Sequence, residues 1–384
     1  MVIVPLIGGL IGYLAIQSNQ QIVLPQSTGK YHVGRTVFDW TDQTRTNAFA
    51  GKPNEQRELM VTAWYPTDDD TGNKAFYMPQ PWLGVAEKDQ SGFGEILTHK
   101  LTNVQTNSYS DASLSNSKKV YPMVIFEPGL GRASYDYSYI AEDLASHGYI
   151  VLSSTPTYIA DMVVFSKGDI ALASSAAQLP ENSDALTKDT LTKTELIRDV
   201  YAGDIAYLLT QVERLNMTLG NAWVGRVDTS RIGVMGHSLG GAAAYHVCLT
   251  DNRCKVALDI DGTLFGEQDS VNKVPFMFLS SDTSNDTGAG VKQEDDYNQA
   301  ILDKQVSPFY QVTIHGAEHF NFSDLALRSP LIRYLGALGT IDRQTGIEVS
   351  RQYIVAMFDK YFENTKPAFL NSNYAIVGST VVQR

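Results

Sequence analysis

The chain has 384 residues, of which 43% are hydrophobic and 19% are charged, so it is long and apolar enough to bury a large core. Its formal net charge is −12, and the sequence contains no basic tract. This acidity excludes a polyanion-binding protein, so we expect no nucleic-acid partner. The sequence contains no internal repeat, and we expect a single domain at residues 31–370.

The first 30 residues differ in composition from this domain. Residues 1–16 are almost wholly apolar and carry no charge, whereas residues 17–30 form a polar linker. The apolar stretch has the length of a signal-peptide core and is shorter than the roughly 20 residues that a spanning helix needs. It is a signal segment, the last part of a membrane anchor, or a core element. We expect a secreted or extracytoplasmic protein, with membrane association through residues 1–16 as the alternative.

The first half of the domain predicts a hairpin followed by a βαβ unit. Residues 34–40 and 57–65 have strand composition, and their proximity in the chain indicates an antiparallel hairpin. Residues 75–119 are irregular and predict a cap-like insertion. A buried strand at 121–126 is followed by a helix at 139–147 and a second buried strand at 149–153. This order indicates a parallel sheet with a right-handed crossover.

The second half continues the same alternation of strands and helices. A second cap-like insertion is predicted at residues 155–194, and residues 371–384 are expected to form a partly loose C-terminal tail. The regular elements between them are an amphipathic helix at 195–215, strands at 232–235, 255–260, 275–279 and 310–314, and a closing helix at 347–362. The fold class is therefore α/β, with a mostly parallel central sheet flanked by helices.

Gly236-His237-Ser238-Leu239-Gly240 fits the G-x-S-x-G nucleophile elbow. The motif lies between a short apolar strand and a helix of small residues, which is the context that the elbow requires. Glycines flank the serine because so sharp a turn leaves no room for a Cβ atom. The turn presents the Ser238 hydroxyl, and the Leu239 N–H points to where an oxyanion would form. The alternative is a Gly/Ser loop that closes an ordinary βα unit.

A serine hydroxyl is a weak nucleophile, so it needs a base that is held by an acid. The candidate acid is Asp261, where the strand at 255–260 gives way to a loop. Asp259, two residues earlier, and Asp282, after the next strand, are the alternatives.

The candidate base is His319, on a glycine-containing loop after the strand at 310–314. His315, at the end of that strand, is the alternative and is expected to have a structural role. Serine, acid and histidine thus follow one another in the chain order of hydrolases that use the elbow.

Three further features complete the set of candidate residues. Gly129-Leu130-Gly131 follows the strand at 121–126, where a second oxyanion donor is expected, so the Leu130 N–H is paired with that of Leu239. Cys248 and Cys254 lack the spacing of a metal or redox motif, and they form either a disulfide or two buried thiols. Four aromatic residues either line the pocket or are explained by core packing or surface exposure: Tyr135, Tyr137, Tyr158 and Phe165.

These motifs, in this order, make the chain resemble the plasma-type platelet-activating-factor acetylhydrolase family and its bacterial relatives, which are α/β-hydrolases. The resemblance spans roughly residues 31–362, and the stretches that carry it are 64–66, 121–126, 129–131, 143–149, 236–241, 261–265 and 316–322. The chain departs from many relatives at Glu127-Pro128, before the Gly-Leu-Gly loop, and in the segment 155–194.

The resemblance implies an α/β-hydrolase fold and the hydrolysis of short or oxidised acyl chains from phospholipids, or of small esters, without a metal or other cofactor. It implies a triad of Ser238, Asp261 and His319, with Leu130 and Leu239 as oxyanion donors. We therefore expect a serine carboxylic-ester hydrolase that acts through an acyl-enzyme. The alternatives are the same residues acting on a lactone or peptide bond, and a non-catalytic binding module built on a hydrolase fold.

Overall fold

The computed structural model describes residues 21–79, 82–83, 101, 104–177, 192–219, 221–267, 269–285, 289–328 and 337–384. The apolar segment 1–16 lies outside these ranges, so the structure does not test its signal, anchor or core interpretation. Within these ranges, no helix is both long enough and apolar enough to cross a membrane.

Six neighbouring parallel strands form the centre of the sheet, as the sequence predicts. In spatial order they are β7 (Ile150–Thr155), β6 (Tyr121–Glu127), β10 (Val227–His237), β11 (Cys254–Ile260), β12 (Phe276–Ser280) and β13 (Phe309–Ile314). The register pairs Gly236 of β10 with Glu127 of β6 on one side and with Asp259 of β11 on the other. The loops after β6, β10 and β11 therefore leave the sheet side by side, at its carboxyl edge.

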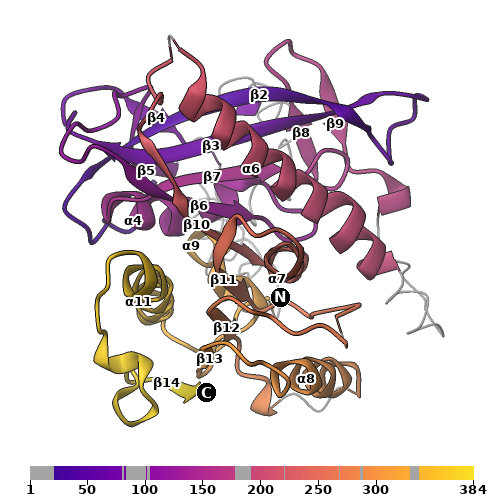
Figure 1. The fold of residues 1–384 in the computed structure, drawn as a ribbon, viewed down its shortest axis with the longest axis vertical. Coiled ribbons are helices and arrows are strands. Elements are labelled where there is room, and N and C mark those ends of the chain that lie inside the picture. Colours follow the sequence, from indigo (N-terminus) through magenta and orange to yellow (C-terminus); the bar gives the residue numbers. More distant parts are fainter. Residues whose placement is uncertain are drawn as a thin grey trace, which may run out of the picture.

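The predicted N-terminal hairpin is also present, and it is longer than expected. Strand β2 (His32–Thr46) pairs antiparallel with β3 (Gln56–Thr67), and β3 pairs antiparallel with β7. Figure 1 shows these two long strands crossing one end of the sheet. The hairpin thus extends the parallel centre rather than forming a unit of its own.

The expectation of an irregular, cap-like segment at residues 75–119 is wrong for residues 75–76 and 104–110, which form strands, whereas residues 111–119 are irregular as expected. Strand β5 (Val104–Ser110) pairs with β2 and β4 (Lys74–Phe76), and β1 (Ile22–Val23), from the expected linker, pairs with β5. All four strands belong to the main sheet. The buried side chains of β5 include Thr106 and Ser108, so the strand lacks the apolar alternation by which a sequence reveals a half-buried strand.

The C-terminal segment forms the other edge of the sheet. Strand β14 (Ser379–Gln383) pairs antiparallel with β13 over five residue pairs, from Tyr310↔Gln383 to Ile314↔Ser379. The prediction of a partly loose tail is therefore wrong for this strand. Its Val381 side chain is buried, whereas Val382 points outward and is 40% exposed.

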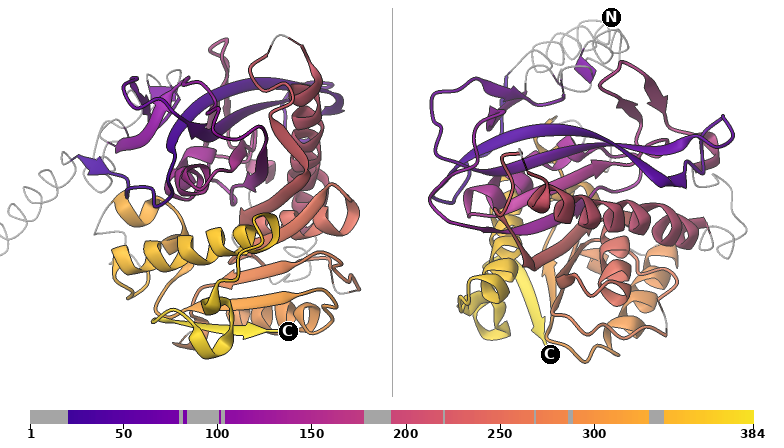
Figure 2. Two further views of the ribbon diagram at one scale, coloured as in Figure 1. Left: turned by 60° about the vertical axis from the view of Figure 1, so that its left-hand side comes forward. Right: turned by 45° about the horizontal axis from the view of Figure 1, so that its top comes forward.

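Helices cover both faces of the sheet, which gives two cores. Helices α4 (Ser138–Ser146) and α11 (Arg343–Phe362) pack on one face, and α6 (Ala202–Met217), α7 (Leu239–Thr250) and α8 (Ala289–Leu302) on the other (Figure 1; Figure 2). Alternate side chains of β6 divide between the two cores, because successive side chains of a strand point to opposite faces. Val124 and Phe126 belong to the first core, and Met123 and Ile125 to the second.

Two predicted segments contain secondary structure that the sequence did not predict. The helix expected at 195–215 is already α-helical at residues 192–195, and it passes through a π-helical stretch, η4 (Leu196–Tyr201), before continuing as α6. The expected cap at 155–194 contains a separate hairpin of β8 (Met162–Val164) and β9 (Ile170–Leu172), and residues 178–191 lie outside the described ranges.

Candidate active site

Ser238 is at the tip of the turn between β10 and α7 and has the backbone strain expected of a nucleophile elbow. Its φ and ψ are 57° and −128°, a conformation that a residue with a Cβ rarely adopts. The Ser238 N–H donates to the Ile260 carbonyl at 2.8 Å, which ties the turn to the end of β11. The turn places Ser238 among the residues that line the cavity described below.

The glycines of the elbow are required by packing. A Cβ atom on Gly236 would meet the backbone of Gly240, and one on Gly240 would meet the carbonyl oxygens of Glu127 and Pro128. The elbow and the loop after β6 are therefore in backbone contact, and only glycine permits it. This contact brings the Leu130 loop beside Ser238.

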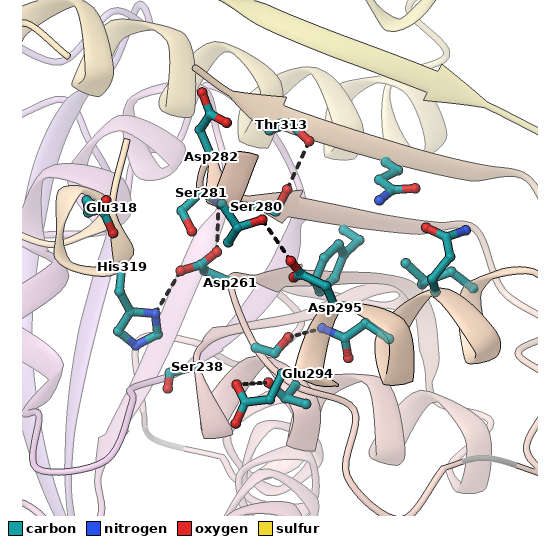
Figure 3. A pocket seen from close by; sticks show the side chains of 18 of the residues that line it. Ser238, Asp261, Ser280, Ser281, Asp282, Glu294, Asp295, Thr313, Glu318 and His319 are labelled. Atoms are coloured by element: carbon teal, nitrogen blue, oxygen red, sulfur yellow. Dashed lines mark hydrogen bonds and ion pairs between the residues drawn. The ribbon is translucent and has the colours of Figure 1, made fainter. Parts of the chain in front are cut away.

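Asp261 and His319 form a hydrogen-bonded pair. The His319 Nδ1 lies 2.7 Å from the Asp261 Oδ2, although 58 residues separate them in the chain. His319 begins the short helix η6 (His319–Phe322), after β13, and Asp261 follows β11 directly. Figure 3 shows the second nitrogen of the imidazole turned toward the side where Ser238 lies. Ser238 and His319 share no hydrogen bond in the described structure, and such bonds often tighten only when substrate binds.

The environment of Asp261 favours the ionised carboxylate. Burial acts to raise its pKa, but hydrogen bonds from His319 and Ser281 outweigh burial, so the pKa lies below its ordinary value. The Ser281 N–H donates to Oδ1 at 2.7 Å, and Asp261 itself has a positive φ of 55°. With the carboxylate ionised, His319 carries a proton on Nδ1 and leaves Nε2 free to accept one.

Asp259, the first alternative acid, lies beneath the elbow and does not face His319. Its carboxyl is fully buried, and Oδ1 accepts the Gly262 N–H at 2.9 Å. Burial raises its pKa well above the ordinary value, which favours the protonated form. A Cβ atom on Gly241 would meet this same Oδ1, so the carboxyl fills the space between the elbow helix and the loop of Asp261.

The other two alternatives interact with each other. Asp282 lies 3.4 Å from His315, and its Oδ2 also accepts the Gly316 N–H at 3.1 Å. His315 also bonds to Thr380 of β14 at 2.8 Å. This pair joins the loops after β12 and β13 and supports the loop that carries His319.

The two residues expected to supply the oxyanion donors both border the cavity. Leu130 and Leu239 line it together with Ser238. Among the described residues, neither of their backbone N–H groups has a hydrogen-bond acceptor. Two free N–H groups beside a serine hydroxyl suit an oxygen on which negative charge develops.

The cavity has a volume of about 720 Å³ and is lined by polar and apolar atoms in similar proportion. One wall comes from α8, a helix that the sequence analysis missed because its sequence is mostly polar. The α8 residues that line the cavity are Glu294, Asp295, Asn298, Gln299 and Leu302. Of the expected cap at 155–194, only Lys193 lines the cavity among the described residues. Within the same ranges, no group of three or more His, Cys, Asp or Glu side chains could hold a metal ion.

The four aromatic candidates do not line this cavity. Three of them are buried, and Tyr137 bonds to His237, the residue before the nucleophile, at 2.8 Å. Sequence reasoning missed this contact because the two residues are 100 positions apart.

Cys248 and Cys254 are joined in a disulfide, which decides between the two interpretations of these residues.

Known proteins resemble this chain over most of its length. The family model of platelet-activating factor acetylhydrolase, isoform II, matches residues 16–156 and 188–375. The platelet-activating factor acetylhydrolase of the dog (Canis lupus familiaris) is 25% identical over 379 residues, which cover 91% of this chain and 79% of the dog protein. That of cattle (Bos taurus) is 25% identical over 373 residues, covering 89% and 78%.

A solved structure shares the fold. A ferulic acid esterase from Streptomyces cinnamoneus superposes with a TM-score of 0.74 at 23% identity, covering 94% of this chain and 99% of that chain. Together, the fold and the relatives make this chain an ester-hydrolysing enzyme of the α/β-hydrolase class. It belongs to the platelet-activating factor acetylhydrolase isoform II family, as the resemblance of its motifs implies.

Proposed function

We propose that the chain is a serine carboxylic-ester hydrolase in which Ser238 is the nucleophile, His319 the general base and Asp261 the acid that orients it. The observation that carries this proposal is the 2.7 Å bond between His319 and Asp261, beside a serine with the strained backbone of an elbow. The three residues lie on the loops after three different strands of one sheet edge, which makes an accidental grouping of these residue types a weak explanation.

The mechanism proposed for these groups runs in two steps. The Ser238 oxygen attacks the ester carbonyl while His319 Nε2 takes its proton and passes it to the leaving alcohol, which gives an acyl-enzyme. Water, deprotonated by the same nitrogen, then attacks the acyl carbonyl and releases the acid and the serine. In both steps the N–H groups of Leu130 and Leu239 donate to the oxyanion. Asp261 holds the imidazole ring and stabilises its positive charge.

The substrate class proposed is an ester with a short acyl chain, or the short acyl group of a phospholipid. The relatives named platelet-activating factor acetylhydrolase support it.

The test is a series of p-nitrophenyl esters from acetate to palmitate, hydrolysed by the wild type and by Ser238→Ala. We expect a maximum at short chains, and a loss of roughly 10⁴- to 10⁶-fold in kcat for the variant. Ser280→Ala is the matched control, because Ser280 lines the same cavity but bonds to Thr313 at 3.1 Å instead. Turnover by Ser238→Ala at the wild-type rate would overturn the proposal, whereas a maximum at long chains would overturn only the short-chain preference.

A further inference from the structure

A buried row of three hydrogen bonds runs behind the candidate active site and joins three of its loops. The Gly129 N–H donates to the Tyr137 hydroxyl at 3.2 Å. That hydroxyl lies 2.8 Å from the His237 Nδ1, and the His237 Nε2 lies 2.9 Å from the backbone carbonyl of His319. The row therefore begins on the loop of Leu130, passes through the residue before Ser238 and ends on the residue proposed as the base.

The direction of every bond in this row is determined. The His319 carbonyl can only accept, so His237 Nε2 must carry a proton and donate it. Burial, and secondarily the charge of His319, lower the pKa of His237 to about 3, so the ring is neutral and its Nδ1 can only accept. The Tyr137 hydroxyl must then donate to Nδ1, and its oxygen accepts the Gly129 N–H. No group in the row can reverse without leaving a buried donor or acceptor unpaired.

Close packing accompanies these bonds. The rings of His237 and His319 lie 4.4 Å apart between centroids, and the Tyr137 ring packs on Phe126 of β6 at 4.7 Å. A Cβ atom on Gly129 would lie only 3.0 Å from His237 Nδ1 and 3.1 Å from the Ser238 Cβ. His237 and Tyr137 are both about 1% exposed or less. A displacement of His237 therefore has no free space to enter and must move the Gly129 loop or His319.

We propose that Tyr137 and His237 are positioning residues that hold the Leu130 oxyanion donor and the His319 imidazole at fixed places relative to Ser238. Neither residue lines the cavity, so each acts through the residues that do. Because a misplacement of about 1 Å can cost roughly 100-fold in rate, a shift of either loop should lower kcat while leaving substrate binding nearly unchanged. The inference rests on the proposed roles of Leu130 and His319.

Three substitutions divide the row into its two halves. Tyr137→Phe removes the hydroxyl and so frees the Gly129 loop. His237→Gln keeps an N–H near the position of Nε2, which preserves the bond to His319 and loses the one to Tyr137. His237→Asn keeps an oxygen near the position of Nδ1, which preserves the bond from Tyr137 and loses the one to His319. Tyr149→Phe is the control, because Tyr149 is equally buried and its hydroxyl bonds to Asp359 at 2.6 Å, away from the cavity.

The measurements are kcat and KM on a short-chain p-nitrophenyl ester, the melting temperature, and the downfield proton resonance of the His319–Asp261 hydrogen bond. We expect a loss of roughly 10- to 100-fold in kcat for all three variants, with little change in KM. Only His237→Asn should shift the resonance, since it alone releases His319. The control should lose melting temperature comparably and keep its kcat.

Two results would overturn the inference. One is wild-type kcat in all three variants. The other is an equal loss of kcat in Tyr149→Phe, which would reduce the effect to a general loss of packing. The Ser238→Ala measurement distinguishes a failure of this inference from a failure of the proposed function. If Ser238→Ala is inactive while the three positioning variants are fully active, the positioning roles are wrong and the proposed function stands.

Discussion

Two aspartates two residues apart, Asp259 and Asp261, lie in surroundings that shift their pKa values in opposite directions. Asp261 leaves the sheet in a positive-φ conformation, meets His319 and the Ser281 N–H, and is held ionised. Asp259 is still inside the strand and accepts one N–H, from Gly262, while its Oδ2 has no hydrogen-bond partner in the described part of the chain. A carboxylate there would be buried without a counter-charge, so the group keeps its proton.

This difference predicts how Asp259 affects stability with pH. Its folded-state pKa is raised, whereas in the unfolded chain it ionises near pH 4. Above that pH, Asp259 is ionised in the unfolded protein and still protonated in the folded protein. The free energy of unfolding therefore falls by up to roughly 1.4 kcal/mol per pH unit, until the folded-state pKa is reached. Asp259→Asn cannot ionise and removes this loss.

The melting temperature of Asp259→Asn relative to wild type should therefore increase as the pH rises from 4 to 8. Its ester hydrolysis should stay near the wild-type level, whereas Asp261→Asn should lose about 10⁴-fold. A melting-temperature difference that is constant with pH would contradict the raised pKa of Asp259. If Asp259→Asn were inactive and Asp261→Asn active, Asp259 rather than Asp261 would be the acid.

At the scale of elements, β5, next to one edge of the sheet, and β14, at the other edge, come from segments without a strong strand pattern. Strand β5 buries Thr106 and Ser108, and β14 contributes few apolar side chains to the core beyond Val381. Such strands are held by pairing with a strand already in place, β2 for one and β13 for the other. The β14 edge also matters to the site, because Thr380 and His315 bond beside the loop of His319.

Strand β14 offers a test of this pairing through two adjacent valines. Val381→Ala should lower the free energy of unfolding by about 2 kcal/mol, because Val381 is 2% exposed. Val382→Ala should change it by less than about 0.5 kcal/mol, because Val382 is on the outer face of the strand. Urea unfolding of both variants measures the difference. Equal effects would mean that residues 379–383 do not alternate between core and solvent.

At the scale of the whole molecule, a covalent bond joins two elements that frame the site. The disulfide Cys248–Cys254 links the last turn of α7 to the first residue of β11. Helix α7 begins at the proposed oxyanion donor Leu239, and β11 leads to Asp261. Disulfides persist in oxidising compartments, so the bond supports the proposal of a secreted or extracytoplasmic enzyme.

The disulfide can be tested by alkylation. The denatured protein should take up no thiol label before reduction and two labels after it, since the chain has two cysteines. Replacing both cysteines by serine should lower the free energy of unfolding by roughly 2 kcal/mol, the loop-closure contribution for so short a loop. Two labels without prior reduction, in protein purified from an oxidising compartment, would contradict the bond.

Much of this architecture could be predicted from the sequence. The six central strands, helices α4, α6 and α11, the hairpin of β2 and β3 and the elbow at Ser238 all follow from apolar patterns or from glycine placement, which act locally along the chain. The choice of Asp261 and His319 also needed only position, because the carboxyl ends of parallel strands meet at one edge of a sheet.

The tertiary structure alone decided the rest, because it depends on contacts between residues far apart in the chain. A polar strand such as β5 can be recognised only from the strands with which it pairs. The cavity wall formed by α8 depends on where this mostly polar helix packs. The protonation of Asp259 depends on burial, and the hydrogen bond between Tyr137 and His237 spans 100 positions. Local pattern determined which elements form and where the serine lies. Packing determined the environment of Asp259, the hydrogen bond between Tyr137 and His237, and the place of α8 in the cavity wall.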